Sequence, residues 1–500
     1  MISASRITGT LARPEETGAG CAIPPTGRPS EALVEVGRST EGRPILARRT
    51  APSASEGLRV LIVAGQHGDE PWARDAARLF ADDFFASAGP MDRSGIGLVV
   101  IPEVNPDGAA RHSRRNAQGI DLNRDHLGLV AAETAALHRF VREYRPHLVV
   151  DVHNYPARRR HLLAQGWTID ADVQYAVPTH PAARTSLDGR AFDDLTAHVA
   201  ERVRARGFSV SPYTLFRRSG RARPSTLRTR DLRNGLALRY GVPTVLLEGR
   251  DPGQRAAASD LARTTGAERA ALHAVVEWAR AHADLLTRGP PVPVPGEPIS
   301  IDGRWRDGGT APLVPLRRES SGRVTAVAWS RYSGERSTSM SVELPRAYAV
   351  RADLRGVLEL LDRHELSGDE AVVPRSALVT RASGPAGSAP GTASSPGTGA
   401  APYASDLNGY RTFSVHQRGG RALAVWLEPQ SRFGIAEAGL LPPGTDAPER
   451  PAILRVLRWD YPGTSPVAPF GRSPASGSGD ERDPEEIDWP RLRADPPELR

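Results

Sequence analysis

The apolar residues of this 500-residue chain gather in short runs that alternate with amphipathic stretches. In the first such stretch, Trp72, Ala76, Phe80 and Phe84 recur at helical spacing. Strands that alternate with helices predict an α/β fold, here with a mixed, largely parallel sheet flanked by helices. Four apolar runs have the composition of strands buried on both faces: LRVLIVAG (58–65), GLVVIPEV (97–104), HLVVDVH (147–153) and PTVLLE (243–248).

Changes in composition predict where the domains begin and end. The α/β domain is followed by the Pro-rich segment GPPVPVPGEP and then by short strand and helix patterns, which predict a smaller C-terminal α+β accessory unit. In that unit, the Gly-Gly pair of TFSVHQRGGRALAVWLEP predicts a β-hairpin. The expected segments are a flexible N-terminal tail (1–29), the α/β domain (30–288), the accessory unit (291–463) with a low-complexity loop (382–402), and a disordered tail (464–500).

The charged and sulfur-containing residues exclude several classes of protein. All 65 basic residues are arginine, and they are spread along the chain, so a net charge of +7 does not indicate nucleic-acid binding. The single cysteine excludes a disulfide framework and a Cys-based zinc finger. No stretch of apolar residues is long enough to predict a membrane span. The first residues lack an apolar signal segment, so a cytoplasmic location is expected, or secretion if the true start lies elsewhere.

Ionisable residues follow the predicted strands where each one ends. His67 and Glu70 come directly after the first strand, and His153 and Glu248 end the third and fourth. In open α/β sheets, ligands bind outside the carboxyl ends of the strands. A single turn can direct His67 and Glu70 at one point, and adding His153 gives two imidazoles and one carboxylate. This set suits a catalytic zinc site with a fourth position for water.

The segment that follows the second strand adds a more specific signal. It reads NPDG at 105–108 and RRNAQGIDLNR at 114–124. Together with HGDE at 67–70, DVH at 151–153 and the strand-end Glu248, it resembles the zinc carboxypeptidase family of carboxypeptidase A-like metallopeptidases. The pieces occur in the family's order, and the resemblance covers residues 30–288, about half of the chain.

The resemblance implies a metal site and the groups around it. His67, Glu70 and His153 would bind one Zn²⁺ per chain, as the His-His-Glu set of carboxypeptidase A does. Asp121 would orient His67 through the other ring nitrogen.

The resemblance also implies roles for residues that contact the substrate. Asn123 and Arg124 would hold the terminal carboxylate, since a guanidinium matches a carboxylate geometrically. Arg114 would polarise the scissile carbonyl and stabilise its oxyanion, with Arg115 as the alternative. Glu248 would act as general base and then as general acid.

The match to the family is incomplete at three points. Asp125 and His126 stand where many relatives have an aromatic residue and then proline, so the pocket wall differs. The family's mobile tyrosine is unassigned, because Tyr240 lies too close to Glu248 and Tyr213 too far from it in sequence. The arginine-rich stretch 217–233 allows either a pocket for acidic substrates or a solvated loop.

The sequence therefore predicts a zinc metallocarboxypeptidase that hydrolyses the C-terminal peptide bond of a peptide. One alternative is a zinc amidase or deacylase of the aspartoacylase/succinylglutamate desuccinylase type, acting on N-acyl amino acids or peptidoglycan-type peptides. Another is a binding module that has lost turnover. Arg114 in its R-x-N context and the NPDG turn favour the peptidase.

Overall fold

A computed structural model gives the structure of the chain. It describes residues 31–50, 57–86, 95–253, 257–366, 368, 376–382, 403–436, 438–441 and 451–459. The expected tails at 1–29 and 464–500 lie outside the described residues, as does the predicted loop apart from its first residue.

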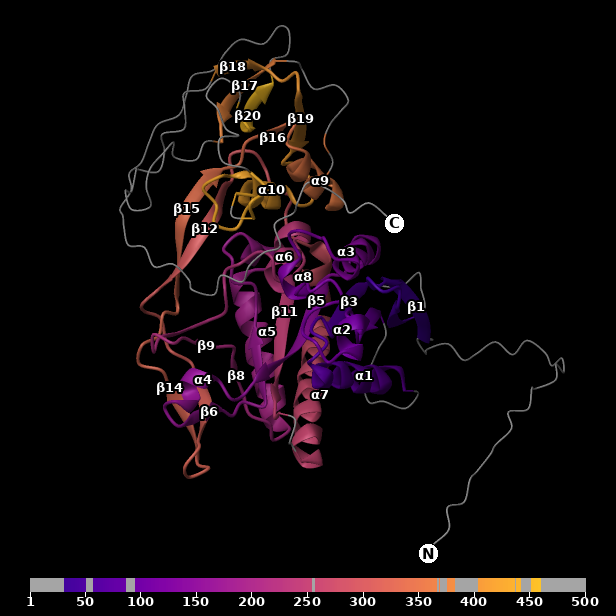
Figure 1. Cartoon of the computed structure of the whole chain (residues 1–500), viewed down its shortest axis with the longest axis vertical. Helices are drawn as coiled ribbons and strands as arrows, with labels where there is room; N and C mark the ends of the chain where they lie inside the picture. The colour runs from indigo at the N-terminus through magenta and orange to yellow at the C-terminus, as the bar shows by residue number, and fades with distance from the viewer. Residues whose placement is uncertain are drawn as a thin grey trace, which may run out of the picture.

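An eight-stranded mixed sheet is the centre of the α/β unit (Figure 1). Four neighbouring strands, β4, β3, β5 and β11, are parallel, while β2 and β7 join them antiparallel on the two sides. This confirms the predicted fold class. The strands, in their order across the sheet, are β1 (Glu31–Arg38), β2 (Pro44–Thr50), β4 (Ile96–Ile101), β3 (Leu58–Ala64), β5 (Leu148–Pro156), β11 (Thr244–Asp251), β7 (Val173–Ala176) and β8 (Val210–Pro212).

Helices cover both faces of this sheet, which explains why its strands are apolar on both sides. Alternate strand residues such as Val60, Ile62 and Val150 pack on one helix layer, and Leu61, Val63 and others pack on the opposite layer. The first layer consists of α1 (Pro71–Phe85), α5 (Gly189–Ala205), α7 (Ala258–Ala281) and α8 (Ala283–Arg288), and the second of α3 (Ala132–Tyr144) and α6 (Leu232–Tyr240).

The C-terminal part lies above α3 and α6 in Figure 1. Its five-stranded sheet is accompanied by two helices, α9 (Arg355–Arg363) and α10 (Gly420–Leu427). One apolar cluster joins Leu127, Ala237 and Leu238 of the α/β unit to residues of this part, so the two share buried surface. The strands of the sheet, in order, are β18 (Tyr403–Asp406), β17 (Ser376–Arg381), β20 (Ile453–Trp459), β16 (Ala347–Arg351) and β19 (Tyr410–Ser414).

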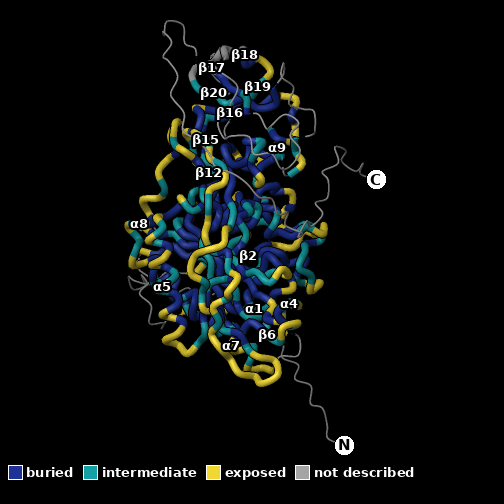
Figure 2. Tube along the Cα trace, turned by 90° about the vertical axis from the view of Figure 1, so that its left-hand side faces the viewer, coloured by how far each residue is buried: buried dark blue, intermediate teal, exposed yellow. Residues whose placement is uncertain are grey.

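A long extension reaches back from the C-terminal part along the α/β unit. β12 (Pro298–Arg306) pairs with β15 (Glu335–Glu343), and β13 (Leu313–Arg318) pairs with both β14 (Val324–Ala328) and β6 (Trp167–Ile169). A strand from beyond residue 291 therefore joins a strand of the α/β unit. Figure 2 shows that the buried residues gather in the interior of the molecule, while exposed residues lie along its outer segments.

The predicted hairpin around the Gly-Gly pair is wrong in its second half. β19 forms the first arm, but residues Gly420–Leu427 form the helix α10. Gly419 has φ +100° and begins this helix, and six consecutive residues from Ala422 to Leu427 are buried. A strand exposes alternate residues on opposite faces, whereas this segment is enclosed on all sides by the apolar cluster.

In the part of the chain that the structure describes, no helix is both long and apolar enough to cross a membrane. The remaining elements of this part are short. They are the helices α2 (Pro106–Ala110) and α4 (Arg160–Leu163), the 3₁₀ turns Leu122–Arg124 and Ala183–Ser186, and the strands β9 (Leu215–Phe216) and β10 (Ala222–Arg223).

Candidate metal centre and active site

Two tight turns at the carboxyl edge of the parallel strands form the base of the site. Gly68, in the turn after β3, contacts the backbone of Gly108, in the turn after β4; a Cβ on Gly68 would lie 2.0 Å from the carbonyl carbon of Gly108. Asn105 joins the turns, because its Nδ2 donates to the carbonyl of Gln66 at 3.1 Å and its Oδ1 accepts from the amide of Gly108 at 2.9 Å. Small residues and one bridging amide thus bring the two strand ends together.

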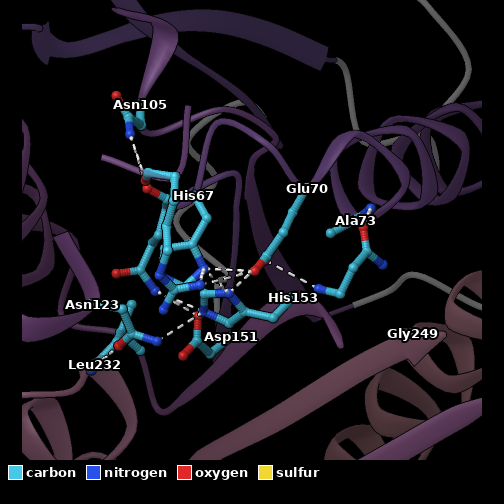
Figure 3. A network of polar contacts seen from close by, with 12 residues as sticks. His67, Glu70, Ala73, Asn105, Asn123, Asp151, His153, Leu232 and Gly249 are labelled. Carbon is cyan, nitrogen blue, oxygen red and sulfur yellow. Dashed lines mark hydrogen bonds and ion pairs between the residues drawn. The ribbon is translucent and has the colours of Figure 1, made fainter. Parts of the chain in front are cut away.

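His67, Glu70 and His153 converge on one point at this edge (Figure 3). Nδ1 of His67 lies 2.7 Å from Oε1 of Glu70, and Nδ1 of His153 lies 2.8 Å from Oε2 of Glu70. The two Nδ1 atoms are 3.1 Å apart. Tetrahedral zinc with bonds of about 2.0–2.1 Å separates its ligand atoms by roughly 3.3 Å, so a small adjustment of these side chains accommodates the ion.

The other ring nitrogens of both histidines face carboxylates. Nε2 of His67 lies 3.1 Å from Oδ1 of Asp121, and Nε2 of His153 lies 3.0 Å from Oδ1 of Asp151. Metal-binding histidines characteristically donate their second N–H to such a group, which fixes the ring and raises its basicity. The donor set and its surroundings therefore fit zinc.

The charges within this cluster are strongly coupled. Burial raises the pKa of Glu70, but the positive charges of His67 and His153 outweigh burial and hold that pKa well below its ordinary value. For Asp121, burial likewise opposes the hydrogen bond and charge of His67 and the charge of Arg114, and the net pKa is far below the ordinary one. Both carboxylates are therefore ionised, as a cation site requires.

Arg114 points toward the same cluster, whereas Arg115 does not. Nη1 of Arg114 lies 3.2 Å from Nδ1 of His67 and 3.5 Å from Oε1 of Glu70, and its Nε donates to Asp121 at 3.1 Å. Arg115 instead donates to the carbonyl of Gly119 at 2.8 Å. Of the two arginines considered from the sequence, Arg114 lies beside the metal ligands.

Asn123 and Arg124 lie in a 3₁₀ turn beside the cluster. Nδ2 of Asn123 is 3.1 Å from Nε2 of His153, and its Oδ1 accepts from the backbone amide of Leu232 at 2.8 Å (Figure 3). Arg124 donates from Nη1 to the carbonyl of Asn123 at 2.6 Å. The aspartate that precedes this turn, Asp121, caps it by accepting from the amide of Asn123 at 3.0 Å.

Glu248 is paired with His153 across the sheet. The parallel register of β5 and β11 sets these two residues opposite each other, so both side chains project from the same face. Burial raises the pKa of Glu248 to about 7; the charge of His153 lowers it and that of Glu70 raises it further. Glu248 thus lies next to the cluster, in surroundings that favour its protonated form more than water does.

Three residues near the site had no role in the sequence interpretation. Asp151 stands two positions before His153, and strand alternation was the signal that could have placed both on one face. Glu268 of α7 is fully buried and accepts hydrogen bonds from the amide of Gly249 at 2.9 Å and from Nδ2 of Asn154 at 3.3 Å. Nothing in the helical pattern around Glu268 indicates this position.

Tyr213 is the third of these residues, although it is distant from Glu248 in sequence. It follows β8, which joins the sheet next to β7 and so approaches β11. Burial raises its pKa to about 12, and the charge of Glu248 adds to the effect. Tyr240 is instead enclosed on the far side of α6, where its hydroxyl lies 2.9 Å from Nδ1 of His138.

Asp125 and His126, the two residues that depart from the family pattern, form hydrogen bonds to residues around the site. Asp125 accepts from the amides of Val130 and Ala131, and burial raises its pKa to about 6. Nε2 of His126 lies 2.8 Å from Oε1 of Gln66, whose Nε2 donates to Asp151 at 2.7 Å. Neither side chain provides one of the candidate metal-ligand atoms.

Comparison with known proteins agrees with this geometry. Residues 29–158 match the family model described as zinc carboxypeptidase. The chain is 31% identical over 110 residues to Carboxypeptidase 2 of Trichophyton rubrum, which covers 21% of this chain and 20% of that protein. With Carboxypeptidase SOL1 of Arabidopsis thaliana it shares 29% identity over 131 residues, covering 23% and 27% of the two chains. The matches thus span about a fifth to a quarter of these relatives' lengths.

Among solved structures, the chain is similar to a metallo-carboxypeptidase from Burkholderia cenocepacia. The identity is 18%, the TM-score is 0.38, and the match covers 50% of this chain and 65% of that one. The family match includes the segments that carry His67, Glu70 and His153, the three side chains that converge in the structure. Residues 29–158, about a quarter of the chain, are thus similar to the zinc carboxypeptidase family.

Proposed function

We propose that the protein is a zinc-dependent metallocarboxypeptidase that hydrolyses the C-terminal peptide bond of a peptide. The observation that carries this proposal is the convergence of two imidazoles and one carboxylate, with the guanidinium of Arg114 3.2 Å from Nδ1 of His67. A metal-binding set beside a fixed cation is what hydrolysis of an amide requires, since negative charge develops on the carbonyl oxygen.

Different residues of the chain have different roles in the hydrolysis. Zinc bound by His67, Glu70 and His153 would lower the pKa of a coordinated water toward about 7. Glu248 takes a proton from the attacking water and passes it to the leaving amine nitrogen. Arg114, held by Asp121, donates to the carbonyl oxygen as it gains negative charge.

The remaining groups orient the substrate. Asn123 and Arg124 bind the terminal carboxylate, which fixes the scissile bond next to the metal ligands. Tyr213 is our candidate for the mobile tyrosine of the family, because its hydroxyl is buried and the charge of Glu248 contributes to its raised pKa. The requirement for a free terminal carboxylate distinguishes a carboxypeptidase from an amidase or deacylase.

A panel of three substrates tests the proposal. Zinc-loaded protein is incubated with a peptide that has a free C-terminus, the same peptide with a C-terminal amide, and an N-acyl amino acid. We expect the free peptide to lose its last residue and the amidated peptide to remain intact. Glu248→Gln should retain zinc and lower kcat by about 10²–10⁴-fold. Hydrolysis of the N-acyl amino acid alone would contradict the proposal and favour a deacylase.

A further inference from the structure

A pocket between the α/β unit and the C-terminal part is lined by basic side chains and, among the described residues, by no acidic one. It has a volume of about 290 Å³. Its walls come from the C-terminal ends of α3 and α6, the segment after α8 and the start of α10. The basic side chains that line it are those of Arg59, Arg145, His147, Arg418 and Arg421.

The pocket lies at the edge of the sheet opposite the metal ligands. His147 comes directly before β5 and Arg59 is the second residue of β3, whereas His153 lies toward the far end of β5. Since a strand advances about 3.3 Å per residue, the path along β5 from His147 to His153 is about 20 Å long. A small ligand in this pocket does not reach the proposed catalytic groups.

The positive charge of the pocket is mostly unneutralised. Arg421 pairs with Glu297, at 2.8 Å from Nη2 to Oε1. Arg59 and Arg418 instead donate from Nε to backbone carbonyls at the C-terminal ends of α3 and α6, at 3.0 Å and 2.8 Å. No described residue accepts a hydrogen bond from the guanidinium of Arg145. A helix C-terminus supplies only about half a negative charge, so the protein does not balance these three arginines.

The unbalanced charges act on one another. Burial lowers the pKa of Arg418, and the positive charges of Arg145 and Arg59 lower it further. Burial also lowers the pKa of His147 to about 4, with the charges of Arg59 and Arg418 adding to the effect. The ring of His147 is therefore neutral at pH 7. The arginines destabilise each other's charge, and a bound anion would relieve this repulsion.

The contacts of His147 show that an acceptor is missing from the pocket. Both ring nitrogens face N–H groups of Arg59: Nδ1 lies 3.0 Å from the backbone nitrogen, and Nε2 lies 3.1 Å from Nη2. A neutral imidazole accepts at one nitrogen and donates at the other. In either tautomer, the N–H of the ring is therefore directed at another donor. An oxygen atom of a bound anion would accept hydrogen bonds from Nε2 of the ring and from Nη2.

We propose that this pocket binds a phosphate group, either as free phosphate or as the ester of a small organic molecule. A guanidinium matches phosphate oxygens geometrically, and a phosphate group carries a charge of about −1.5 to −2 at pH 7, more than one carboxylate supplies. Ala237, Leu238 and Pro290 line the same pocket and provide apolar contacts for the organic part of an ester. The inference is independent of the proposed function, because the two sites lie at opposite edges of the sheet.

Titration calorimetry on the full-length protein at low ionic strength tests the inference with phenyl phosphate, inorganic phosphate and benzoate. We expect phenyl phosphate to bind more tightly than benzoate, a monoanion with the same ring. Arg418→Gln should weaken phenyl phosphate binding by about 10- to 100-fold, the range for hydrogen bonds to charged groups. Arg145→Gln should also weaken it, without removing a hydrogen bond from the fold. Thermal unfolding without ligand verifies that both variants are folded.

Two control variants show where the anion binds. Arg190→Gln removes an exposed arginine of α5 that does not line the pocket, so it matches the change in net charge. Arg124→Gln removes a cation of the proposed active site. We expect both controls to bind phenyl phosphate as the wild type does.

Each outcome of the titrations decides a point. Binding that Arg418→Gln and Arg145→Gln weaken, and that both controls retain, would support the phosphate site. Tighter binding of phenyl phosphate than of inorganic phosphate then identifies an organic ester as the ligand, and equal or weaker binding identifies free phosphate. Binding that only Arg124→Gln abolishes, benzoate binding as tight as that of phenyl phosphate, or no binding of either phosphate would overturn the inference.

Discussion

Nε2 of His153 lies 3.0 Å from Oδ1 of Asp151, and both residues are buried on the same face of β5. The same oxygen accepts a hydrogen bond from Nε2 of Gln66 at 2.7 Å. Asp121 holds His67 in the corresponding way at 3.1 Å. Each candidate zinc-binding histidine thus has its own carboxylate, and in both cases the Nδ1 atom is left to face Glu70.

Replacing Asp151 should weaken metal binding without removing a ligand. We expect Asp151→Asn to lower zinc affinity by about 10- to 100-fold, because the neutral amide no longer raises the basicity of His153 or fixes its ring as firmly. Competition with a chelator of known affinity measures the change. Asp75→Asn, which alters an exposed aspartate paired with Arg78, is the control. Equal zinc affinity for Asp151→Asn and wild-type protein would contradict this role.

Arg114 and Arg115 should differ greatly in their effect on turnover. Arg114→Met removes the guanidinium beside the metal ligands and should lower kcat/KM by about 10²–10³-fold. Arg115→Met removes a hydrogen bond to the carbonyl of Gly119 and should change kcat/KM by about threefold at most. Steady-state kinetics on one peptide, at matched zinc occupancy, measures both. A larger loss for Arg115→Met would transfer the role to that residue.

The buried Glu268 should make stability depend on pH. Burial raises its pKa well above the ordinary value, although the hydrogen bonds from Gly249 and Asn154 oppose this shift. The carboxyl is therefore protonated in the fold, while in the unfolded chain it ionises above about pH 4.3. Its contribution is complete below that pH and is lost as pH rises toward the folded pKa, by at most about 1.4 kcal/mol per pH unit.

Glu268→Gln removes this titration and so provides the test. Relative to wild-type protein, the variant should gain stability steadily between about pH 5 and pH 8, whatever its stability at pH 5. Urea denaturation at several pH values measures the difference. Glu277→Gln, on the same helix at a solvent-facing ion pair with Arg202, should show no such trend. A pH-independent difference for Glu268→Gln would show that its carboxyl is ionised in the fold.

A buried ion pair should be essential to the C-terminal part. Glu428 is fully buried and is bound by Arg455 (Nε to Oε1, 2.7 Å) and by the hydroxyl of Tyr348 at 2.8 Å. Arg455→Met leaves this carboxylate without its cation, and we expect the free energy of unfolding to fall by about 3–5 kcal/mol. Arg38→Met, at an exposed pair with Glu35, should cost no more than about 1 kcal/mol. Urea denaturation measures both changes. An equally small loss in the free energy of unfolding for the two variants would contradict the prediction.

The sequence allowed the parallel strands and the metal-binding residues to be predicted because both depend on local patterns. Apolar runs that are followed by His67 or end in His153 and Glu248 indicate strands whose carboxyl ends meet. Asp151 was within reach of the same reasoning, since it alternates with His153. These features need only strand periodicity and the rule that parallel strands share one edge.

Other features depend on contacts that a local pattern does not contain. Glu268 lies on α7, where a glutamate ordinarily faces water, and its burial follows from the close approach of Gly249. Tyr213 comes closer to Glu248 in the fold than in the sequence because β8 lies next to β7, and β7 next to β11, in the sheet. The residues after Gly419 resemble a strand in hydrophobicity, yet they form α10 because apolar surroundings enclose every side of the segment.

The most direct test of the central claim is the zinc content of the purified protein. Mass spectrometry of metal bound per chain, after dialysis against zinc and then against metal-free buffer, compares wild-type protein with His67→Ala. We predict about one zinc per chain in the wild type and almost none in the variant, with both proteins folded. An absence of zinc from the wild type, or equal zinc in the two proteins, would contradict the assignment of this metal centre.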